Sequence, residues 1–219
     1  MIAAATYNFF QILFWPGGGW IGVFLWLLSV VMVALVVQAF LAIRRATMLP
    51  DKLHKDVRGL IDAKQYRAAL EMTSKDPSLL GGVMHAALAA APHGYHAMEK
   101  ALADTAADRT TLLLRSVEWL NLLGNISPML GLLGTVWGMI RAFFAIVEAG
   151  GIPNAAMLAE ALGIKLVCTF VGLIVAIPSL AVYGFMRNRI DGYSAEAVNI
   201  TQRLISGFRP VRKEQEISI

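Results

Sequence analysis

The stretch Leu120–Ile146, LNLLGNISPMLGLLGTVWGMIRAFFAI, is an almost unbroken apolar run. It is long enough to cross a bilayer, since a spanning helix needs about 20 largely apolar residues. Read at helical spacing, six small or polar residues fall on one stripe: Gly124, Pro128, Gly131, Thr135, Gly138 and Ala142. Helices in lipid pack through small residues that let their backbones approach. The stretch therefore predicts a membrane helix with a partner pressed against this stripe, or with a cavity in front of it.

A simpler interpretation of the stripe is tight helix packing with no other function. Thr135 does not decide between the two interpretations, because a threonine hydroxyl in a helix can bond to a carbonyl of its own backbone.

The composition favours a membrane protein. Hydrophobic residues make up 57% of the chain and charged residues only 16%, which is typical of a chain buried in lipid and helix contacts. The single cysteine, Cys168, excludes a disulfide within the chain. No metal-binding spacing, phosphate loop or pair of nucleophile and base is visible, so we expect no cofactor, no metal and no enzymatic activity.

We expect an all-α integral membrane protein with three transmembrane helices and long cytoplasmic helical extensions. The expected parts are an external interfacial helix over 1–19, spans over 20–43, 119–147 and 157–186, a cytoplasmic helical insertion over 44–118, an external loop over 148–156 and a cytoplasmic tail over 187–219. Residues 97–147 contain no obvious break before the loop, which predicts one continuous helix of about 75 Å at 1.5 Å per residue.

The third apolar run carries a second stripe at helical spacing: Lys165, Thr169, Gly172, Ala176 and Ser179. This helix must pack against the second span, because only a short turn joins the two. Pro178 lies beside the stripe and would kink the helix, which neighbouring helices can accommodate.

Basic residues near the ends of the spans set the orientation. They fall on one side of the membrane: Arg44, Arg45, Lys52, Lys55, Arg58, Arg109, Arg115, Arg187 and Arg189. That side is predicted to be cytoplasmic, whereas the other side has an uncharged N-terminal segment and a loop with Glu148. No basic run or basic–aromatic surface indicates nucleic-acid binding.

Two motifs together carry a family resemblance. The segment 127–140, SPMLGLLGTVWGMI, followed by 169–178, TFVGLIVAIP, resembles the MotA/TolQ/ExbB proton-channel family, nearest its ExbB and TolQ branch. The resemblance implies a bacterial inner-membrane protein with a periplasmic N-terminus and a cytoplasmic C-terminus. It also implies a homo-oligomeric ring, a pentamer in ExbB and TolQ, around two single-span ExbD- or TolR-like helices, with a TonB- or TolA-like envelope protein as a further partner.

Two family positions carry over as proton-pathway residues, Thr135 and Thr169. In the family, a membrane aspartate on the partner helix carries the proton and the ring supplies hydroxyl groups around it. A hydroxyl both donates and accepts hydrogen bonds, so it can solvate a carboxyl group in either protonation state. Gly124, Pro128, Gly131, Gly138, Gly172 and Pro178 are the expected helix-packing residues.

One position departs from the family pattern. Many ExbB-type sequences carry a glutamate five residues before the third-span threonine, where this chain has Ile164. Glu160, Lys165 and Arg141 are the charged residues near the same outer end. Two interpretations of Lys165 stay open: pairing with Glu160 or snorkelling to the interface, and a role at the pore mouth. Arg141, which lies off the threonine stripe, is open to pairing with Glu148 or Glu160 or to a role at the pore mouth.

The leading hypothesis is a ring subunit of an ExbB/TolQ-type motor that uses proton flow to energise envelope transport or integrity. An oligomeric membrane scaffold that carries no ions is the alternative from another class. A flagellar-type stator subunit is a third, but those proteins have four spans and a larger charged cytoplasmic domain.

Overall fold

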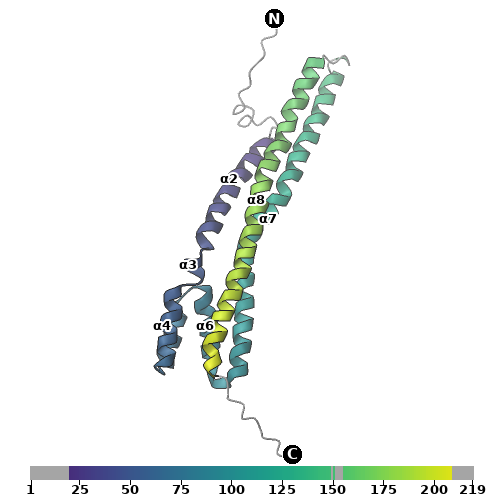
Figure 1. Cartoon of the computed structure of the whole chain (residues 1–219). Helices are drawn as coiled ribbons and strands as arrows, with labels where there is room; N and C mark the ends of the chain where they lie inside the picture. The colour runs from purple at the N-terminus through teal and green to yellow at the C-terminus, as the bar shows by residue number, and fades with distance from the viewer. Residues whose placement is uncertain (1–19, 149, 151–154, 209–219) are drawn as a thin grey trace, which may run out of the picture. The chain divides into compact units, whose positions relative to one another are not determined.

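The structure, a computed structural model, describes residues 20–148, 150 and 155–208, with side chains described in the last range at 163 and from 165 onward. The described residues form helices only. In chain order they are α2 (Trp20–Ala42), α3 (Arg45–Met48), α4 (Asp51–Asp62), α5 (Tyr66–Lys75), α6 (Leu79–Ala89), the 3-10 turn η1 (Ala91–His93), α7 (Tyr95–Glu148), α8 (Ala155–Ile205) and the 3-10 turn η2 (Ser206–Phe208) (Figure 1).

The chain divides into two compact units. Of the described residues, the first unit, which we call the spanning unit, contains those within 20–39 and 117–185, and the second, the helical unit, contains those within 40–116 and 186–208. Helix α7 has 54 residues and α8 has 51. Each of these two long helices has one part in the spanning unit and the other part in the helical unit. The predicted continuous helix over 97–147 is confirmed.

In the spanning unit, α2 packs on α7 and α8 through two small apolar clusters. Ile21 and Leu25 of α2 meet Cys168 of α8 in one cluster. Met32 of α2 meets Leu123 of α7 and Val175 of α8 in the other. The three apolar helices therefore form one packed group, as their uncharged sequences predict.

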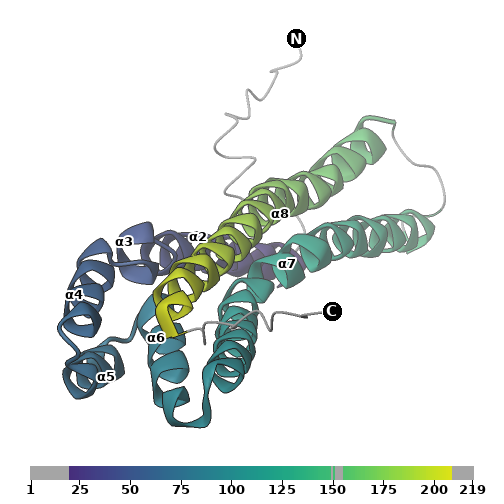
Figure 2. The same ribbon diagram turned by 60° about the horizontal axis from the view of Figure 1, so that its bottom comes forward.

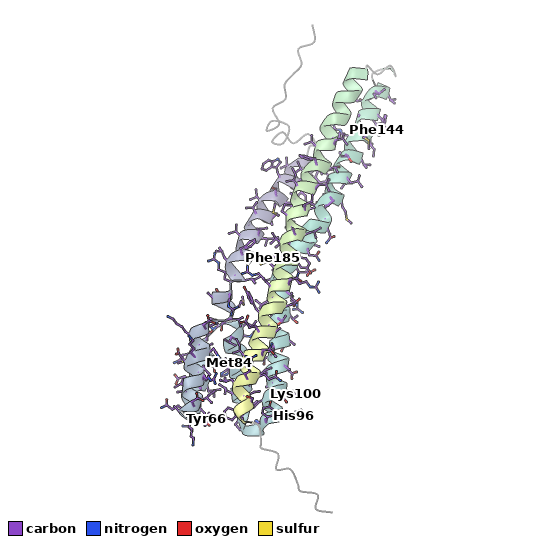
Figure 3. All side chains as sticks on the ribbon, viewed as in Figure 1. Tyr66, Met84, His96, Lys100, Phe144 and Phe185 are labelled. Atoms are coloured by element: carbon purple, nitrogen blue, oxygen red, sulfur yellow. The ribbon has the colours of Figure 1, made fainter. Side chains whose placement is uncertain are left out.

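The outer surface of the spanning unit is strongly apolar. Exposed large side chains include Leu27 and Val30 on α2 and Ile177 on α8. Phe144 on α7 is another (Figure 3). Three helices, α2, α7 and α8, are long and apolar enough to cross a membrane. Exposed apolar helices of this length are stable in a bilayer, where their own backbones satisfy every polar group. The predicted all-α membrane fold with three spanning helices is confirmed.

The helical unit has a core of its own around α6. Val83 and Met84 are fully buried there (Met84 is labelled in Figure 3). Buried residues of α4, α5 and the first turns of α7 belong to the same core, and Figure 2 shows these helices. The end of α8 contributes Ala197 and Ile205 to the same core. Helix α6 is apolar around most of its circumference, which is the pattern of a helix buried in a bundle.

Local signals explain where the helices of this unit begin and end. Lys64 has a φ of 60°, and this left-handed residue separates α4 from α5. Ser78 caps α6, because its hydroxyl accepts a hydrogen bond from the Gly81 amide at 3.0 Å. Gly94, with a φ of 94°, lets the chain reverse before α7. The charged, turn-rich sequence of residues 47–94 thus gives short helices.

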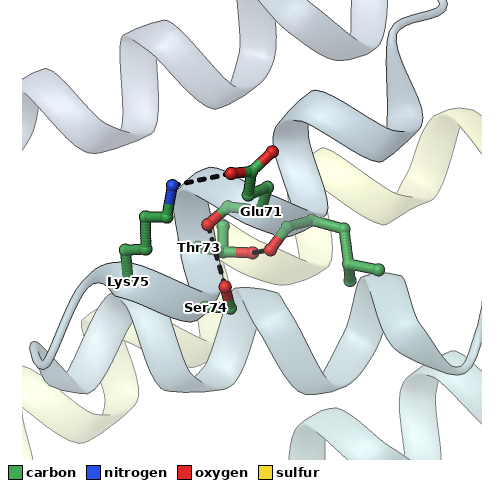
Figure 4. Close-up of polar contacts among 5 residues, drawn as sticks. Glu71, Thr73, Ser74 and Lys75 are labelled. Carbon is green, nitrogen blue, oxygen red and sulfur yellow. Dashed lines mark hydrogen bonds and ion pairs between the residues drawn. The ribbon is translucent and has the colours of Figure 1, made fainter.

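Helix α5 carries the polar contacts drawn in Figure 4. Lys75 pairs with Glu71 one turn earlier at 2.6 Å. This hydrogen bond, and then the charge of Lys75, lowers the pKa of Glu71. Thr73 and Ser74 donate their hydroxyl protons to carbonyls of their own helix, so these residues are satisfied locally.

Three parts of the predicted organisation lie wholly or partly outside the described residues. They are the interfacial helix over 1–19, most of the loop over 148–156 and the tail beyond residue 208.

Candidate functional site

The two stripes of small residues face each other across α7 and α8. A Cβ atom added to Gly131 would lie 2.8 Å from the Cys168 carbonyl oxygen and 2.9 Å from the Thr169 Cα. A Cβ added to Gly172 would lie 2.6 Å from the Ser127 carbonyl oxygen. Backbone therefore meets backbone at this level, which only glycine permits.

The same contact continues toward both ends of the spanning unit. Gly124 of α7 lies under the Leu180 side chain, and Gly138 lies under the aliphatic stem of Lys165. Along the glycines of α7, the partner pressed against the stripe is thus α8 of the same chain. No separate helix is needed to explain these glycines.

Thr135 lies inside this contact. Its side chain is 6% exposed, and its hydroxyl donates to the Leu132 carbonyl oxygen of its own helix at 2.7 Å. The preceding residue, Gly134, faces Cys168 of α8. The hydroxyl proton is therefore engaged by its own helix, but the hydroxyl oxygen can still accept a hydrogen bond from another group.

Thr169 lies close to the same level of the helix pair. Its Cα faces Gly131, which is one helical turn from Thr135. The side chain is half-buried, and no hydrogen-bond partner for its hydroxyl is found among the described residues. The structure thus brings the two predicted threonines within about one helical turn of each other. The Thr135 hydroxyl can accept a hydrogen bond, and the Thr169 hydroxyl can still donate one.

Two prolines lie near this level within uninterrupted helices. Pro128 is half-buried in α7, and Pro178 is exposed on α8. Proline has no backbone N–H, so the carbonyls four residues earlier, at Gly124 and Ile174, lose their usual helical donor. Each proline therefore adds a carbonyl acceptor within an apolar span.

The predicted charged residues lie at one end of the spanning unit. Arg141 and Glu148 are exposed on α7, and no ion pair joins them within the part of the chain that the structure describes. Lys165 is half-buried, with its stem on Gly138, as expected for a side chain that snorkels along an apolar surface. The side chain of Glu160 lies outside the described residues, so its predicted pairing with Lys165 stays a prediction.

A second polar group in the spanning unit was not predicted. Glu118 of α7 accepts hydrogen bonds from Asn121 of the same helix and from Tyr183 of α8, and Asn125 bonds to Asn121. The spacing of Glu118, Asn121 and Asn125 by three and four residues could have revealed one helix face. The contact with Tyr183 could not be read from spacing, because it joins residues 65 positions apart.

Among the side chains that the structure describes, no group of three or more His, Cys, Asp or Glu residues is placed to hold a metal ion. The Thr135 oxygen at the α7–α8 contact can still accept a hydrogen bond, and the Thr169 hydroxyl can donate one.

Comparison with known proteins agrees with the motifs. Residues 73–198 match the family described as the MotA/TolQ/ExbB proton channel family. Biopolymer transport protein ExbB of Salmonella typhimurium is 28% identical over 117 residues, 48% of either chain. The protein of the same name from Pseudomonas putida is 25% identical over 163 residues, 70% of this chain and 49% of the relative. That from Neisseria gonorrhoeae is 42% identical over 64 residues, 29% of either chain. The chain spans about half the length of the Salmonella and Pseudomonas relatives.

Proposed function

The chain belongs to the MotA/TolQ/ExbB proton channel family, and from this we propose that it is a ring-forming subunit of an ExbB-type motor. In this proposal the motor sits in the bacterial inner membrane and uses the proton-motive force to energise transport or integrity of the cell envelope. Its partner is an ExbD- or TolR-like subunit with one spanning helix, which transmits the work to a TonB- or TolA-like protein. The ring is a pentamer, with the N-terminus periplasmic and the C-terminus cytoplasmic.

One observation carries the proposal. The family match over 73–198 includes both motif threonines, and the structure places Thr169 against Gly131, one turn from Thr135. Sequence motifs alone do not require that two residues 34 positions apart lie at one level of a helix pair. The close approach of α7 and α8 through glycine supports that arrangement.

The chemistry follows from the hydroxyl groups. A carboxyl group carried into an apolar span holds its proton, because desolvation disfavours the charged form. Thr169 has a hydroxyl donor available for the carboxylate, and the Thr135 oxygen accepts a hydrogen bond from the protonated acid. The two threonines thereby reduce the difference in energy between the two protonation states, which lets the carboxyl group release its proton. The charged residues Arg141 and Lys165 stand at the outer end of this path.

Proton flux in liposomes tests the proposal. The chain is reconstituted with its single-span partner, and an imposed membrane potential drives proton entry that a trapped dye reports. We expect Thr135→Val and Thr169→Val to lower flux by about tenfold or more, since each variant keeps the shape but removes the hydroxyl. Thr135→Ser, which keeps the hydroxyl, retains flux.

Thr111→Val is the matched control. Thr111 is exposed on α7 in the helical unit, and its hydroxyl donates to the Ala107 carbonyl of its own helix, so its loss leaves conduction unchanged. If Thr135→Val and Thr169→Val both conduct protons as fast as the wild type, the proposed roles of these two threonines are wrong. Absence of flux from the assembled wild-type complex favours the alternative, an oligomeric scaffold that carries no ions.

A further inference from the structure

The hydrogen-bonded group Glu118, Asn121, Asn125 and Tyr183, which we call the polar run, has no role in the function proposed above. The Glu118 carboxylate accepts from the Asn121 amide at 2.7 Å and from the Tyr183 hydroxyl at 3.2 Å. The Asn125 amide donates to the Asn121 carbonyl oxygen at 2.8 Å and to its side-chain oxygen at 2.9 Å. Four side chains from two helices thus form one continuous chain of polar atoms.

The polar run extends into the apolar part of the spans. The charged residues Lys165 and Arg187 enclose an uncharged segment of α8 that is about 33 Å long, close to the hydrocarbon thickness of about 30 Å. Glu118 contacts Tyr183 at the Arg187 end of this segment. Asn125 lies seven residues further along α7, which places it about 10 Å deeper.

The polar run is not covered by the chain itself. Glu118 and Asn125 are exposed, and Asn121 and Tyr183 are half-buried. A carboxylate and an amide are strongly disfavoured on a surface that contacts acyl chains, and polar groups within spans usually face a water-filled cavity or another protein surface.

The polarity of this face ends partway along α7. Continuing from Asn125 at helical spacing, the next exposed residues on the face are Met129, Leu132 and Val136. A face that interacted with another subunit along its full length would have no reason to change from polar to apolar at mid-span. A face that is wet from one side of the membrane has this pattern.

We infer that the polar run lines a water-filled inlet on the cytoplasmic side of the conduction path, with Glu118 as its proton-exchanging group. The assignment of the inlet to conduction rests on the proposed function. A proton that reaches Glu118 converts its carboxylate to the acid, and release to cytoplasmic water restores the carboxylate, so no other reactant is consumed. Asn121, Asn125 and Tyr183 position that carboxylate and order the water beside it.

Thiol labelling tests the inlet without measuring conduction. In a Cys168→Ala background, single cysteines are introduced as Asn125→Cys and Ile126→Cys in the full assembly, in open membrane fragments. Ile126 is the matched control, since it is exposed at the same depth on another part of the α7 surface. A charged methanethiosulfonate reacts only with a thiolate in water, so we expect it to label Asn125→Cys about tenfold or more faster. Equal labelling rates for Asn125→Cys and Ile126→Cys overturn the inlet. That result means either that both positions are buried in an interface or that both lie in lipid.

Flux measurements then test the role of Glu118. Asn121 and Tyr183 donate to the two different oxygens of Glu118. Glu118→Gln keeps the length of the side chain and one of these acceptors but cannot exchange a proton, so we expect flux to fall about tenfold or more. Glu71→Gln, on the exposed surface of α5, is the control and leaves flux unchanged. Unchanged flux in Glu118→Gln overturns its role. If the wild-type complex passes no protons while Asn125→Cys still labels fast, the proposed function fails and the water-filled inlet stands.

Discussion

At the scale of single residues, glycine sets the distance between α7 and α8. Gly172 is the clearest case, because an added Cβ would lie 2.6 Å from the Ser127 carbonyl oxygen and 3.3 Å from the Gly131 Cα. Both neighbours are backbone atoms, which cannot rotate away as a flexible side chain can. Any substitution here must separate the two helices.

We therefore expect Gly172→Ala to destabilise the spanning unit by about 1–3 kcal/mol, the usual cost of overpacking. The measurement is the unfolding midpoint in a mixed-detergent titration, followed by circular dichroism. Gly184→Ala in the same helix is the control, since a Cβ there meets no atom within 4 Å. A glycine-to-alanine change in an open helix position is neutral or stabilising by up to about 1 kcal/mol. Equal midpoints for the two variants would contradict the packing described here.

Some features of single residues could be predicted from the sequence, and others could not. The stripes containing Gly131, Thr135 and Gly172 were predictable, because small residues at steps of three and four mark one helix face regardless of the rest of the fold. The contact between Glu118 and Tyr183 was not, because it depends on the register between α7 and α8. Coordinates were also needed to show that the Thr135 hydroxyl bonds its own helix, since the rotamer of a threonine decides whether its hydroxyl does so.

At the scale of elements, α6 organises the helical unit. Eight of its eleven residues are buried, and Met84 and Ala87 are fully enclosed. Its sequence is apolar but too short to cross a bilayer, and this combination is typical of a core helix. The bundle predicted between the first two spans therefore has a definite centre.

Removing a side chain from that centre tests the assignment. Met84→Ala should destabilise the helical unit by about 2–5 kcal/mol, because it leaves a cavity in a packed core. Met72→Ala on α5 is the control: Met72 is 37% exposed, and exposed substitutions usually change stability by less than about 0.5 kcal/mol. Hydrogen exchange of the full chain in detergent, read by mass spectrometry, resolves the two units. Faster exchange in residues 79–89 of Met84→Ala only is the expected result; equal exchange in both variants would exclude α6 as the core.

At the scale of the whole molecule, the exposed surface of the spanning unit has two kinds of region. Large apolar side chains cover α2 and the outer parts of α7 and α8. Glu118, Asn121, Asn125 and Tyr183 form one polar group on this surface, and Arg141 and Lys165 mark a second polar region at the other end. In the proposed ring, lipid and neighbouring subunits cover the apolar surface, and the polar groups belong to the two mouths of the path.

The orientation of the chain in the membrane decides which mouth of the proposed proton path is cytoplasmic and which is periplasmic. Basic residues follow the apolar runs of α2 and α8 in the sequence, as with Arg44, Arg45 and Arg187, and short basic segments are retained in the cytoplasm. A protease-cleavable tag inserted after Gly150, between α7 and α8, is therefore expected to be cut in intact spheroplasts. The same tag inserted after Lys64, in the turn between α4 and α5, should be cut only in inverted vesicles. Cleavage of the Lys64 tag in spheroplasts would reverse the orientation and place Glu118 at the periplasmic mouth, whereas the contacts between α7 and α8 would be unaffected.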